Sequence, residues 1–554
     1  MKINLLSSFA AASASILFPQ SVSGQEESTS HLLRGSSSGQ QQVQEVHQVR
    51  QVEGQVERST QAQGATSSAK NGVIIDPATN AVIDDWSKAL IAAIRKYSTP
   101  PPKASRAMAM VHLAIFEALN GIDEKYDRYH VTGVPAAGAS SVAAAATAAH
   151  GVLSSLFPTE VATFDALLTS SVAPVPSSPL ASGSAWGRAC ANDVLSLRLN
   201  DNSDLIVGYT SPGGTPGLWE PTFPNYAPAL LPSWPQVLPF AMGGASELRP
   251  QGPPSLTSQE YAIAYDEVKN VGNKTSAIRT ADMSQIAIFW ADGAGTETPP
   301  GHWLRIASEV STARGMPPLE RARLLALVGL GVADAAIVSW DAKYAYHHWR
   351  PITAIRAGSA DTNDATVEDP NFLPLIGTPP FPGYTSGHST FSAASARILG
   401  RVFGDSVSFS TNSNVMTNVA RSFASFSAAA AEAGQSRIYG GIHFQYDNRD
   451  GLSSGKALGD IVVDGFLRLI GDLNNDGCVD DADLAILASQ IGQTNSRADL
   501  NKDGIVDNKD RVIFKNYLSS SCTTASASTG GGDPEQGQDD QDQDNQGQDN
   551  DFFS

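Results

Sequence analysis

Three short polar motifs, far apart along the chain, constrain the fold because their side chains suit a single binding site. The motifs span Lys343–Pro351, Ser386–His388 and Ser436–Asp447. Together they supply three cationic side chains, two histidines and a glycine-containing turn that can open a helix. A fold that brings the three segments together would hold a compact anion with several oxygens, such as phosphate or vanadate.

The spacing within the first two motifs predicts how they would meet the anion. Lys343 and Arg350 are seven residues apart, so on a helix they would lie on nearly the same face. An arginine fork suits two oxygens of one anion, whereas a lysine acts as a point charge. Ser386 is a good N-cap for a helix over residues 389–399, and Gly387 would let the backbone approach a ligand.

The two histidines suit different tasks. His443 has a ring nitrogen for the central atom, and Asp447, four residues on, would share its helical face and fix its tautomer. His388 would then be the acid/base group over the open side of the anion. Singly, such residues are more often solvated helix faces or structural histidines, but the combination in this order favours one oxyanion site.

The motif set resembles the vanadium-dependent haloperoxidases and their superfamily relatives, the type 2 phosphatidic acid phosphatases and bacterial acid phosphatases. The family pattern is Lys-x6-Arg-Pro, Pro-Ser-Gly-His and Ser-Arg-x5-His-x3-Asp, and Thr385 stands where the family usually has Pro. The resemblance covers residues 75–470 and implies an all-α fold with two helical bundles, with the anion at the end of one.

The resemblance also implies roles. His443 would bond to vanadium, His388 would assist peroxide binding, and Asp292 would pair with Arg437. The residues expected to bind the remaining oxygens are Lys343, Arg350, Ser386, Gly387 and Arg437. Trp340 and Phe381 match aromatic positions that line the pocket of fungal chloroperoxidases, where algal bromoperoxidases have Arg and His. Ordinary core packing explains these two aromatics equally well.

Three functions are compatible with these residues. The first is a secreted vanadate-dependent haloperoxidase, chloroperoxidase-like, that oxidises halide with hydrogen peroxide to hypohalous acid, with the metal as a Lewis acid. The second is a secreted acid phosphatase, in which His443 attacks phosphorus and His388 protonates the leaving group. The third is a non-catalytic, calcium-dependent adaptor. The complete motif set disfavours the third, and the extent of the resemblance favours the first.

The character of the chain changes after Ile470. Two loops, 27 residues apart, place carboxylates and amides at alternate positions around a glycine, with an acidic twelfth residue, which suits calcium. The predicted ligands are Asp472, Asn474, Asp476, Asp480 and Asp483 in the first loop, and Asp499, Asn501, Asp503, Asp507 and Asp510 in the second. The duplicated unit resembles a type I dockerin, which implies two calcium ions, an EF-hand-like α-helical module and a cohesin-like partner. Where dockerins often carry Ser-Thr, this chain has Asp481-Ala482 and Asn508-Lys509, which puts the cohesin partner in doubt.

Composition divides the chain into five parts. We expect a signal peptide over 1–24, a disordered Gln/Ser-rich segment over 25–72, the helical domain over 73–470, the calcium module over 471–522 and a disordered acidic tail over 523–554. Residues 471–554 hold 17 acidic and five basic groups, so most of the net charge of −19 belongs to the calcium module and tail. Nothing in this pattern predicts nucleic-acid binding, and we expect no stretch after the leader to be long and apolar enough to cross a membrane.

Apolar spacing predicts helices, and Pro-rich stretches predict connections. The helices are expected over 83–97, 105–120, 317–340 and 451–470, and the connections over 99–102, 211–254, 298–301 and 370–382. Cys478 and Cys522 bracket the calcium module and are candidates for a disulfide in a secreted protein, whereas Cys190 is expected to be buried and inert.

Overall fold

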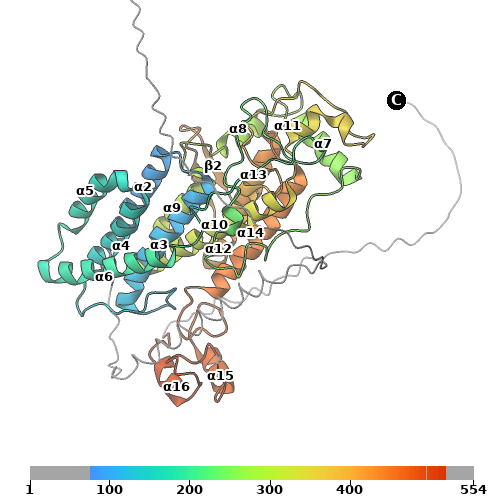
Figure 1. Cartoon of the computed structure of the whole chain (residues 1–554). Helices are drawn as coiled ribbons and strands as arrows, with labels where there is room; N and C mark the ends of the chain where they lie inside the picture. The colour runs from blue at the N-terminus through green and yellow to red at the C-terminus, as the bar shows by residue number, and fades with distance from the viewer. Residues whose placement is uncertain (1–74, 495, 520–554) are drawn as a thin grey trace, which may run out of the picture. The chain divides into compact units, whose positions relative to one another are not determined.

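The computed structural model describes residues 75–494 and 496–519, and these are mostly helical (Figure 1). Strand pairing in this part of the chain is confined to one antiparallel hairpin, β1 (Phe409–Asn412) with β2 (Ala420–Phe423), and a few isolated bridges. The predicted all-α class is therefore confirmed. The expected signal peptide, Gln/Ser-rich segment and acidic tail lie outside the described residues, as does Cys522.

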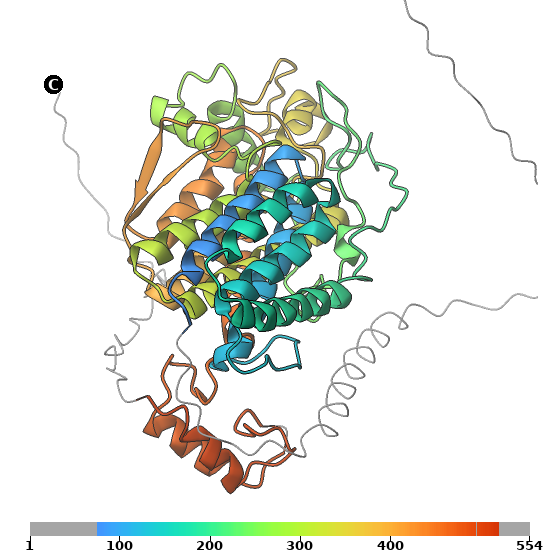
Figure 2. The ribbon, with the colours of Figure 1, turned by 90° about the vertical axis from the view of Figure 1, so that its left-hand side faces the viewer.

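The first group of helices precedes the oxyanion motifs. It comprises α2 (Thr79–Lys96), α3 (Pro101–Asp123), α4 (Ser141–Leu156), α5 (Val161–Val172) and α6 (Ser177–Leu197), with the 3-10 turn η1 (Pro158–Glu160) before α5. Helix α4 packs against α3, α5 and α6, as Figure 2 shows for the teal and green helices. Residues 142–146 of α4 are buried valine and alanines, whose small side chains let the neighbouring helices approach closely.

The second group of helices carries the three motifs. It comprises η2 (Trp234–Gln236), α7 (Gln259–Val271), α8 (Ala281–Phe289), α9 (Thr298–Ala313), α10 (Pro318–Tyr346), α11 (Pro351–Arg356), η3 (Gly358–Ala360), α12 (Gly387–Phe403), α13 (Phe426–Tyr439) and α14 (Gln445–Gly465). Helix α10 contacts α3 of the first group as well as α9, α12 and α14. One continuous apolar core therefore runs through both groups.

Helix α10 corrects the expectation that no stretch after the leader is apolar enough to cross a membrane. Its best 18-residue window has a mean hydropathy of 1.8, which is sufficient by length and composition. Of that window, 94% is buried inside the protein. A helix that is apolar on all sides is expected wherever a core surrounds it.

Two local expectations were wrong. Residues 298–301 were expected to be a connection, but they form the first turn of α9, where proline is tolerated because the N–H groups of that turn have no helical partner. Lys343 and Arg350 were expected on one helix, but α10 ends at Tyr346 and His347 adopts a left-handed conformation with φ of 49°. Arg350 is extended before Pro351, because proline disfavours a helical conformation in the preceding residue.

The C-terminal module forms its own small core. Its helices are α15 (Asp481–Ser489) and α16 (Asn508–Phe514), and each begins at an aspartate N-cap, Asp480 and Asp507 respectively. Val479, Leu487 and Phe514 are among the residues buried between them. The predicted small α-helical module is confirmed.

Candidate active site

The three motifs meet where four helices begin or end. Lys343 lies in the last turn of α10, Ser386 caps α12, Arg437 lies near the end of α13, and Asp447 lies in the first turn of α14. Arg350, four residues beyond α10, completes the set. Each of these five side chains is at most 2% exposed.

Lys343 is held by backbone carbonyls that lie just before the second motif. Its Nζ donates to Pro382 O at 3.0 Å, to Gly383 O at 2.9 Å and to Thr385 O. Three acceptors satisfy the three N–H groups of a fully buried ammonium. Lys343 therefore fixes the loop that leads to Ser386 and places a positive charge beneath it.

The two buried arginines each have a buried donor without a protein partner. Arg350 donates through Nε to Phe381 O and through Nη1 to Ile442 O, both at 2.8 Å, whereas Nη2 has no partner. Arg437 donates through Nη1 to Trp290 O at 3.0 Å, and its buried Nε has no partner. Buried donors without acceptors are rare in proteins, and an anion with several oxygens would satisfy both.

The N-terminus of α12 lies beside these cations. Ser386 Oγ accepts from the Ser389 N–H at 3.3 Å, and the Ser386 N–H donates to Asp447 O at 2.9 Å. The approach of α14 to this turn depends on glycine, because a Cβ at Gly451 would lie 2.8 Å from Ser386 O and one at Gly455 would lie 2.3 Å from Thr390 O. Close packing of α12 and α14 thus joins the second motif to the third.

His443 is oriented from both sides of its ring. Nδ1 lies 2.8 Å from Asp447 Oδ2, and Nε2 lies 2.9 Å from Arg350 Nη1. Arginine can only donate, so Nε2 is the acceptor and Nδ1–H donates to the carboxylate. His443 precedes α14 rather than lying on it, so the contact was expected on a shared helical face but forms across the start of the helix, where Asp447 Oδ2 also accepts from Phe444 N.

His388 occupies the second position of α12. It is half-buried, and its Nε2 is buried without a partner. Burial lowers the pKa of His388 well below its ordinary value, and the positive charge of Arg437 lowers it further. A neutral imidazole with an unpartnered nitrogen suits an acid/base role toward a bound ligand.

Burial shifts the pKa values of the charged site residues toward their neutral forms, and repulsion between neighbouring cations adds to this shift for Lys343 and Arg350. Burial lowers the pKa of Lys343, and Arg350 adds to that effect. Burial also lowers the pKa of Arg350 to about 9 and that of Arg437 to about 10. Burial raises the pKa of Asp447 to about 7, although Lys343 opposes the rise. A bound anion would relieve the repulsion among the three cations.

Trp340 and Phe381 form one wall of the site. Their ring centroids are 4.8 Å apart, and the Phe381 centroid lies 5.1 Å from Lys343 Nζ and 4.9 Å from Arg350 Cζ. A Cβ added to Gly387 would lie 3.6 Å from the Trp340 ring. The aromatics are part of the core and also border the cations, so the two interpretations of these residues are compatible.

Asp292 is placed differently from the expectation. The described residues contain no ion pair between Asp292 and Arg437; the carboxylate Oδ2 instead lies 3.0 Å from His302 Nδ1. Asp292 follows the end of α8, and α9 brings His302 against it. The sequence did not indicate His302, because residues 298–301, which form the first turn of its helix α9, were expected to be a connection.

The two predicted calcium loops have matching internal hydrogen bonds. In each loop the carboxylate of the twelfth residue accepts from the backbone N–H of the ninth residue and from that of the third. In the first loop Asp483 accepts both bonds at 3.0 Å. In the second loop Asp510 accepts them at 2.8 Å and 3.0 Å. In both loops the glycine N–H donates to the first aspartate at 2.9 Å. Such repetition indicates that the two loops are built alike.

The donor set of both loops is oxygen-rich, which suits calcium. The glycines at the sixth position, Gly477 and Gly504, have φ of 88° and 98°, which only glycine adopts without strain. Among the described side chains, no three His, Cys, Asp or Glu groups converge on one point. The carboxylates accept hydrogen bonds from their own loops instead. Cys478 is disulfide-bonded, and its expected partner lies outside the described residues.

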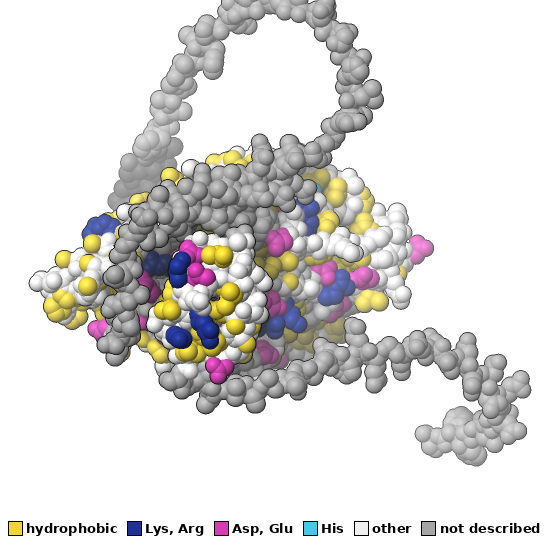
Figure 3. Space-filling model, turned by 90° about the horizontal axis from the view of Figure 1, so that it is seen from below, with side chains coloured by type: hydrophobic (Ala, Val, Ile, Leu, Met, Phe, Trp, Pro, Cys, Tyr) yellow, Lys and Arg dark blue, Asp and Glu magenta, His cyan; other side chains and the backbone are white. Residues whose placement is uncertain are grey.

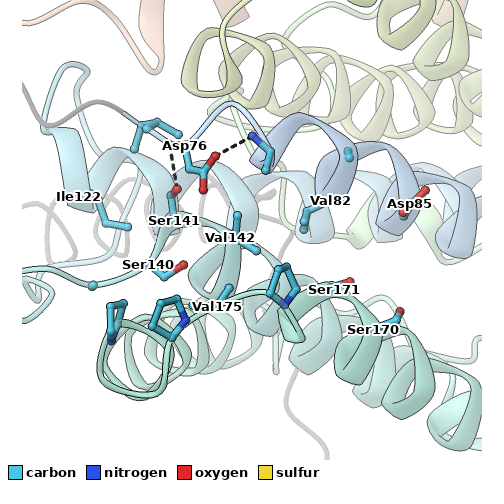
Figure 4. Close-up of a pocket in the computed structure, with 17 residues that line it drawn as sticks. Asp76, Val82, Asp85, Ile122, Ser140, Ser141, Val142, Ser170, Ser171 and Val175 are labelled. Atoms are coloured by element: carbon cyan, nitrogen blue, oxygen red, sulfur yellow. Dashed lines mark hydrogen bonds between the residues drawn. The ribbon is translucent and has the colours of Figure 1, made fainter.

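A cavity of about 650 Å³ lies elsewhere, beside α2, α4 and α6 (Figure 4). Its wall includes the hydroxyls of Ser140, Ser141 and Ser170, and its charged lining residues are Asp76 and Asp85. Because the lining contains acidic but no basic side chains, this cavity does not suit an anion. Basic and acidic side chains are interspersed on the face in Figure 3.

Comparison with known proteins agrees with the site. Residues 323–472 match the family model described as the VCPO second helical-bundle domain, and residues 470–519 match that of the dockerin type I domain. The vanadium chloroperoxidase of Curvularia inaequalis is 29% identical over 182 residues, which cover 28% of this chain and 30% of that protein. The match thus spans under a third of that relative.

Solved structures extend the likeness over more of the chain. A bacterial vanadium-dependent iodoperoxidase aligns with 70% of this chain and 97% of its own length, at 27% identity and a TM-score of 0.65. A holo-type bacterial vanadium-dependent chloroperoxidase aligns with 72% of this chain and 95% of its own, at 16% identity and a TM-score of 0.51, and so shows the fold alone. The resemblance to vanadium haloperoxidases, followed by a type I dockerin, is confirmed.

Proposed function

We propose that this chain is a vanadate-dependent haloperoxidase, which oxidises halide with hydrogen peroxide to hypohalous acid. The observation that supports an oxyanion site most is the pair of buried, unpartnered donors, Arg350 Nη2 and Arg437 Nε, beside an oriented His443. The similarity to vanadium haloperoxidases favours this reaction at the site. The residues present fit vanadate, since they offer cationic donors for its oxygens and a ring nitrogen for its central atom. When bound, vanadate would supply Lewis-acid activation of peroxide.

Each protein group has a separate task in this proposal. Asp447 holds the proton of His443 at Nδ1, so that Nε2 carries the lone pair, which here accepts from Arg350 Nη1 and which the ligand would take over. Lys343, Arg350 and Arg437 neutralise the oxygens, and the α12 N-terminus adds the Ser386 hydroxyl and the Gly387 N–H, because the Ser386 N–H already donates to Asp447 O. His388 exchanges a proton at Nε2 with the bound reactant. Trp340 and Phe381 keep water from the cations, which strengthens their attraction for the anion.

A phosphatase would use the same residues, because phosphate and vanadate have the same shape and charge. The test compares the full-length chain after vanadate loading and after phosphate treatment, in assays of halide oxidation and of phosphate-ester hydrolysis. Halide oxidation that needs vanadate and is competed by phosphate supports the proposal. Ester hydrolysis without vanadate-dependent halide oxidation would replace it with the phosphatase, and neither activity in a folded chain would favour the adaptor.

The C-terminal module has a proposed function of its own. Two calcium ions would bind the loops that begin at Asp472 and Asp499, and α15 and α16 would dock a cohesin-like extracellular partner. The leader-like residues 1–24 and the disulfide at Cys478 support export of the protein. Binding of an immobilised cohesin domain with calcium and with a chelator tests the partner, since only the calcium form is expected to bind.

A further inference from the structure

Two hydroxyls and one amide form a line of hydrogen bonds that starts at Ser386 in the oxyanion site. Ser389 Oγ lies 2.8 Å from Ser386 Oγ and 2.8 Å from Asn448 Oδ1. Ser386 and Ser389 belong to the start of α12, whereas Asn448 lies near the start of α14. All three residues are at most 4% exposed, and we call them the Ser386 relay. Neither Ser389 nor Asn448 belongs to the three sequence motifs.

Close packing of three helices fixes the Ser386 relay. The Ser386 N–H donates to Asp447 O at 2.9 Å, which holds the start of α14 against the start of α12. A Cβ at Gly434 of α13 would lie 2.1 Å from Asn448 Oδ1 and 3.2 Å from Ser389 Oγ. Helix α13 can therefore approach the relay this closely only because residue 434 has no side chain.

The number of hydrogens limits the relay to two arrangements. Two hydrogen bonds join the three groups, and the Ser389 hydroxyl can donate only one of them. If Ser389 donates to Asn448 Oδ1, then Ser386 donates to Ser389, and the Ser386 hydrogen is engaged within the relay. If Ser389 donates to Ser386 instead, the Asn448 amide turns so that its N–H group donates to Ser389. The Ser386 hydrogen is then free for a ligand.

We propose that Ser389 and Asn448 are positioning residues of the oxyanion site, and that anion binding reverses the relay so that the Ser386 hydroxyl donates to the anion. Ser386 Oγ then accepts from both the N–H and the hydroxyl of Ser389, which uses its two lone pairs. The reversal needs only rotations of two hydroxyls and one amide, and no covalent bond changes.

Asparagine suits the end of the relay because its amide offers both an acceptor and a donor. A half-turn of the amide exchanges the oxygen for the NH₂ group, so Asn448 can serve either arrangement. The inference rests on the proposed oxyanion site but not on the reaction that occurs there, because phosphate and vanadate would accept the same hydrogen.

The test measures binding of inorganic phosphate to the full-length chain by titration calorimetry at mildly alkaline pH. Asn448→Asp should weaken phosphate binding by about tenfold or more, the usual effect of losing one hydrogen bond to a charged group. The reason is that a carboxylate only accepts, and so keeps the Ser386 hydrogen within the relay. Asn448→Ala should instead bind phosphate more tightly than the wild type, because the Ser389 hydrogen then has no competing acceptor and passes to Ser386. Asn120→Asp is the matched control, since Asn120 is a buried asparagine of α3 whose amide pairs with the backbone of Tyr126, and its substitution should leave the affinity unchanged.

A double-mutant cycle separates the relay from the negative charge that Asn448→Asp adds. That charge repels phosphate in every background, whereas the relay depends on Ser389. The loss caused by Asn448→Asp should therefore be smaller in a Ser389→Ala background, where the Ser386 hydrogen has no competing acceptor. Equal losses in the two backgrounds, or equal weakening by Asn120→Asp, would overturn the inference.

A second cycle avoids the buried charge and serves if Asn448→Asp does not fold. The tighter binding expected for Asn448→Ala should disappear in a Ser386→Ala background, because the relay acts on the anion only through the Ser386 hydroxyl. Weaker binding by Asn448→Ala, or the same effect of that substitution in both backgrounds, would overturn the inference. Wild-type affinity in the Ser386→Ala variant would also overturn it. A wild-type chain that binds neither phosphate nor vanadate would reject the oxyanion site itself.

Discussion

His443 Nδ1 lies 2.8 Å from Asp447 Oδ2, and this contact crosses the start of α14. The same carboxylate oxygen accepts the Phe444 N–H, so one side chain both orients the histidine and caps the helix. The orientation of His443 is thereby tied to the packing of α14 against α12. A ligand bond to Nε2 would be made by a ring that the fold has already placed.

Replacing Asp447 with Asn should weaken vanadate binding by roughly 10–100-fold, because the amide no longer specifies which ring nitrogen carries the proton. Calorimetric titration with vanadate provides the measurement. Asp460→Asn is a control on the same helix, where Asp460 pairs with Arg397 at 2.7 Å. Wild-type affinity in the Asp447 variant would mean that the contact only caps the helix.

The two histidines should fail in different ways. His443→Ala should abolish stable vanadate retention, because the proposed direct protein bond to the metal is lost. His388→Ala should retain vanadate but lose turnover by roughly 10²–10⁴-fold, the usual contribution of acid/base assistance. Vanadium content after gel filtration and the rate of halide oxidation separate the two effects. Equal vanadium loss in both variants would contradict the assignment of His388 to proton transfer.

Phe381→His should alter halide preference or the pH optimum without preventing vanadate binding. The Phe381 centroid lies about 5 Å from both Lys343 Nζ and Arg350 Cζ, so a histidine there would add a titratable group beside the cations. Rates with chloride, bromide and iodide across a pH series provide the test. Phe372→Leu, in the separate buried cluster, is the packing control. An unchanged profile would leave Phe381 as core packing alone.

Calcium should stabilise the C-terminal module, because binding energy at loops that need the ion becomes folding energy. The full-length chain is expected to show a low-temperature unfolding transition in chelator that moves upward with added calcium. Asp483→Ala and Asp510→Ala should each reduce that movement, since both carboxylates close their loops. A transition that ignores calcium in the wild-type chain would exclude a calcium-dependent fold.

The sequence allowed the charged residues of the site to be predicted, but not the groups that hold them. Lys343 is fixed by the backbone carbonyls of Pro382, Gly383 and Thr385. Because every residue has a backbone carbonyl, the residue types in the sequence do not identify these acceptors. The break between Lys343 and Arg350 was readable, since Pro351 disfavours helix at Arg350. The pairing of His302 with Asp292 depends on how α9 packs, and no local pattern reports that.

Glu117 offers a test of burial away from the proposed active site. It is 1% exposed on α3, and its Oε1 accepts the backbone N–H groups of Tyr129 and His130. Burial raises its pKa from 4.5 to about 7, although those two hydrogen bonds and Arg128 oppose the rise. The folded chain thus binds this proton more tightly than the unfolded chain. The resulting stabilisation is complete below the unfolded value of 4.5 and is lost as pH rises through 7.

The glutamine side chain of the Glu117→Gln variant cannot ionise, so this variant does not lose the stabilisation as pH rises. Between pH 4 and pH 8 its free energy of unfolding should therefore increase by about 3 kcal/mol relative to that of the wild type. The gain is a difference between two pH values, so any constant cost of placing an amide beside the buried Oε2 position cancels. Denaturant unfolding followed by tryptophan fluorescence, with calcium present throughout, gives the four free energies needed. Glu309→Gln is the control, because the Glu309 side chain is 47% exposed and its substitution should give no such trend. A difference between Glu117→Gln and wild type that stays constant with pH would mean that the Glu117 carboxyl titrates normally in the folded chain.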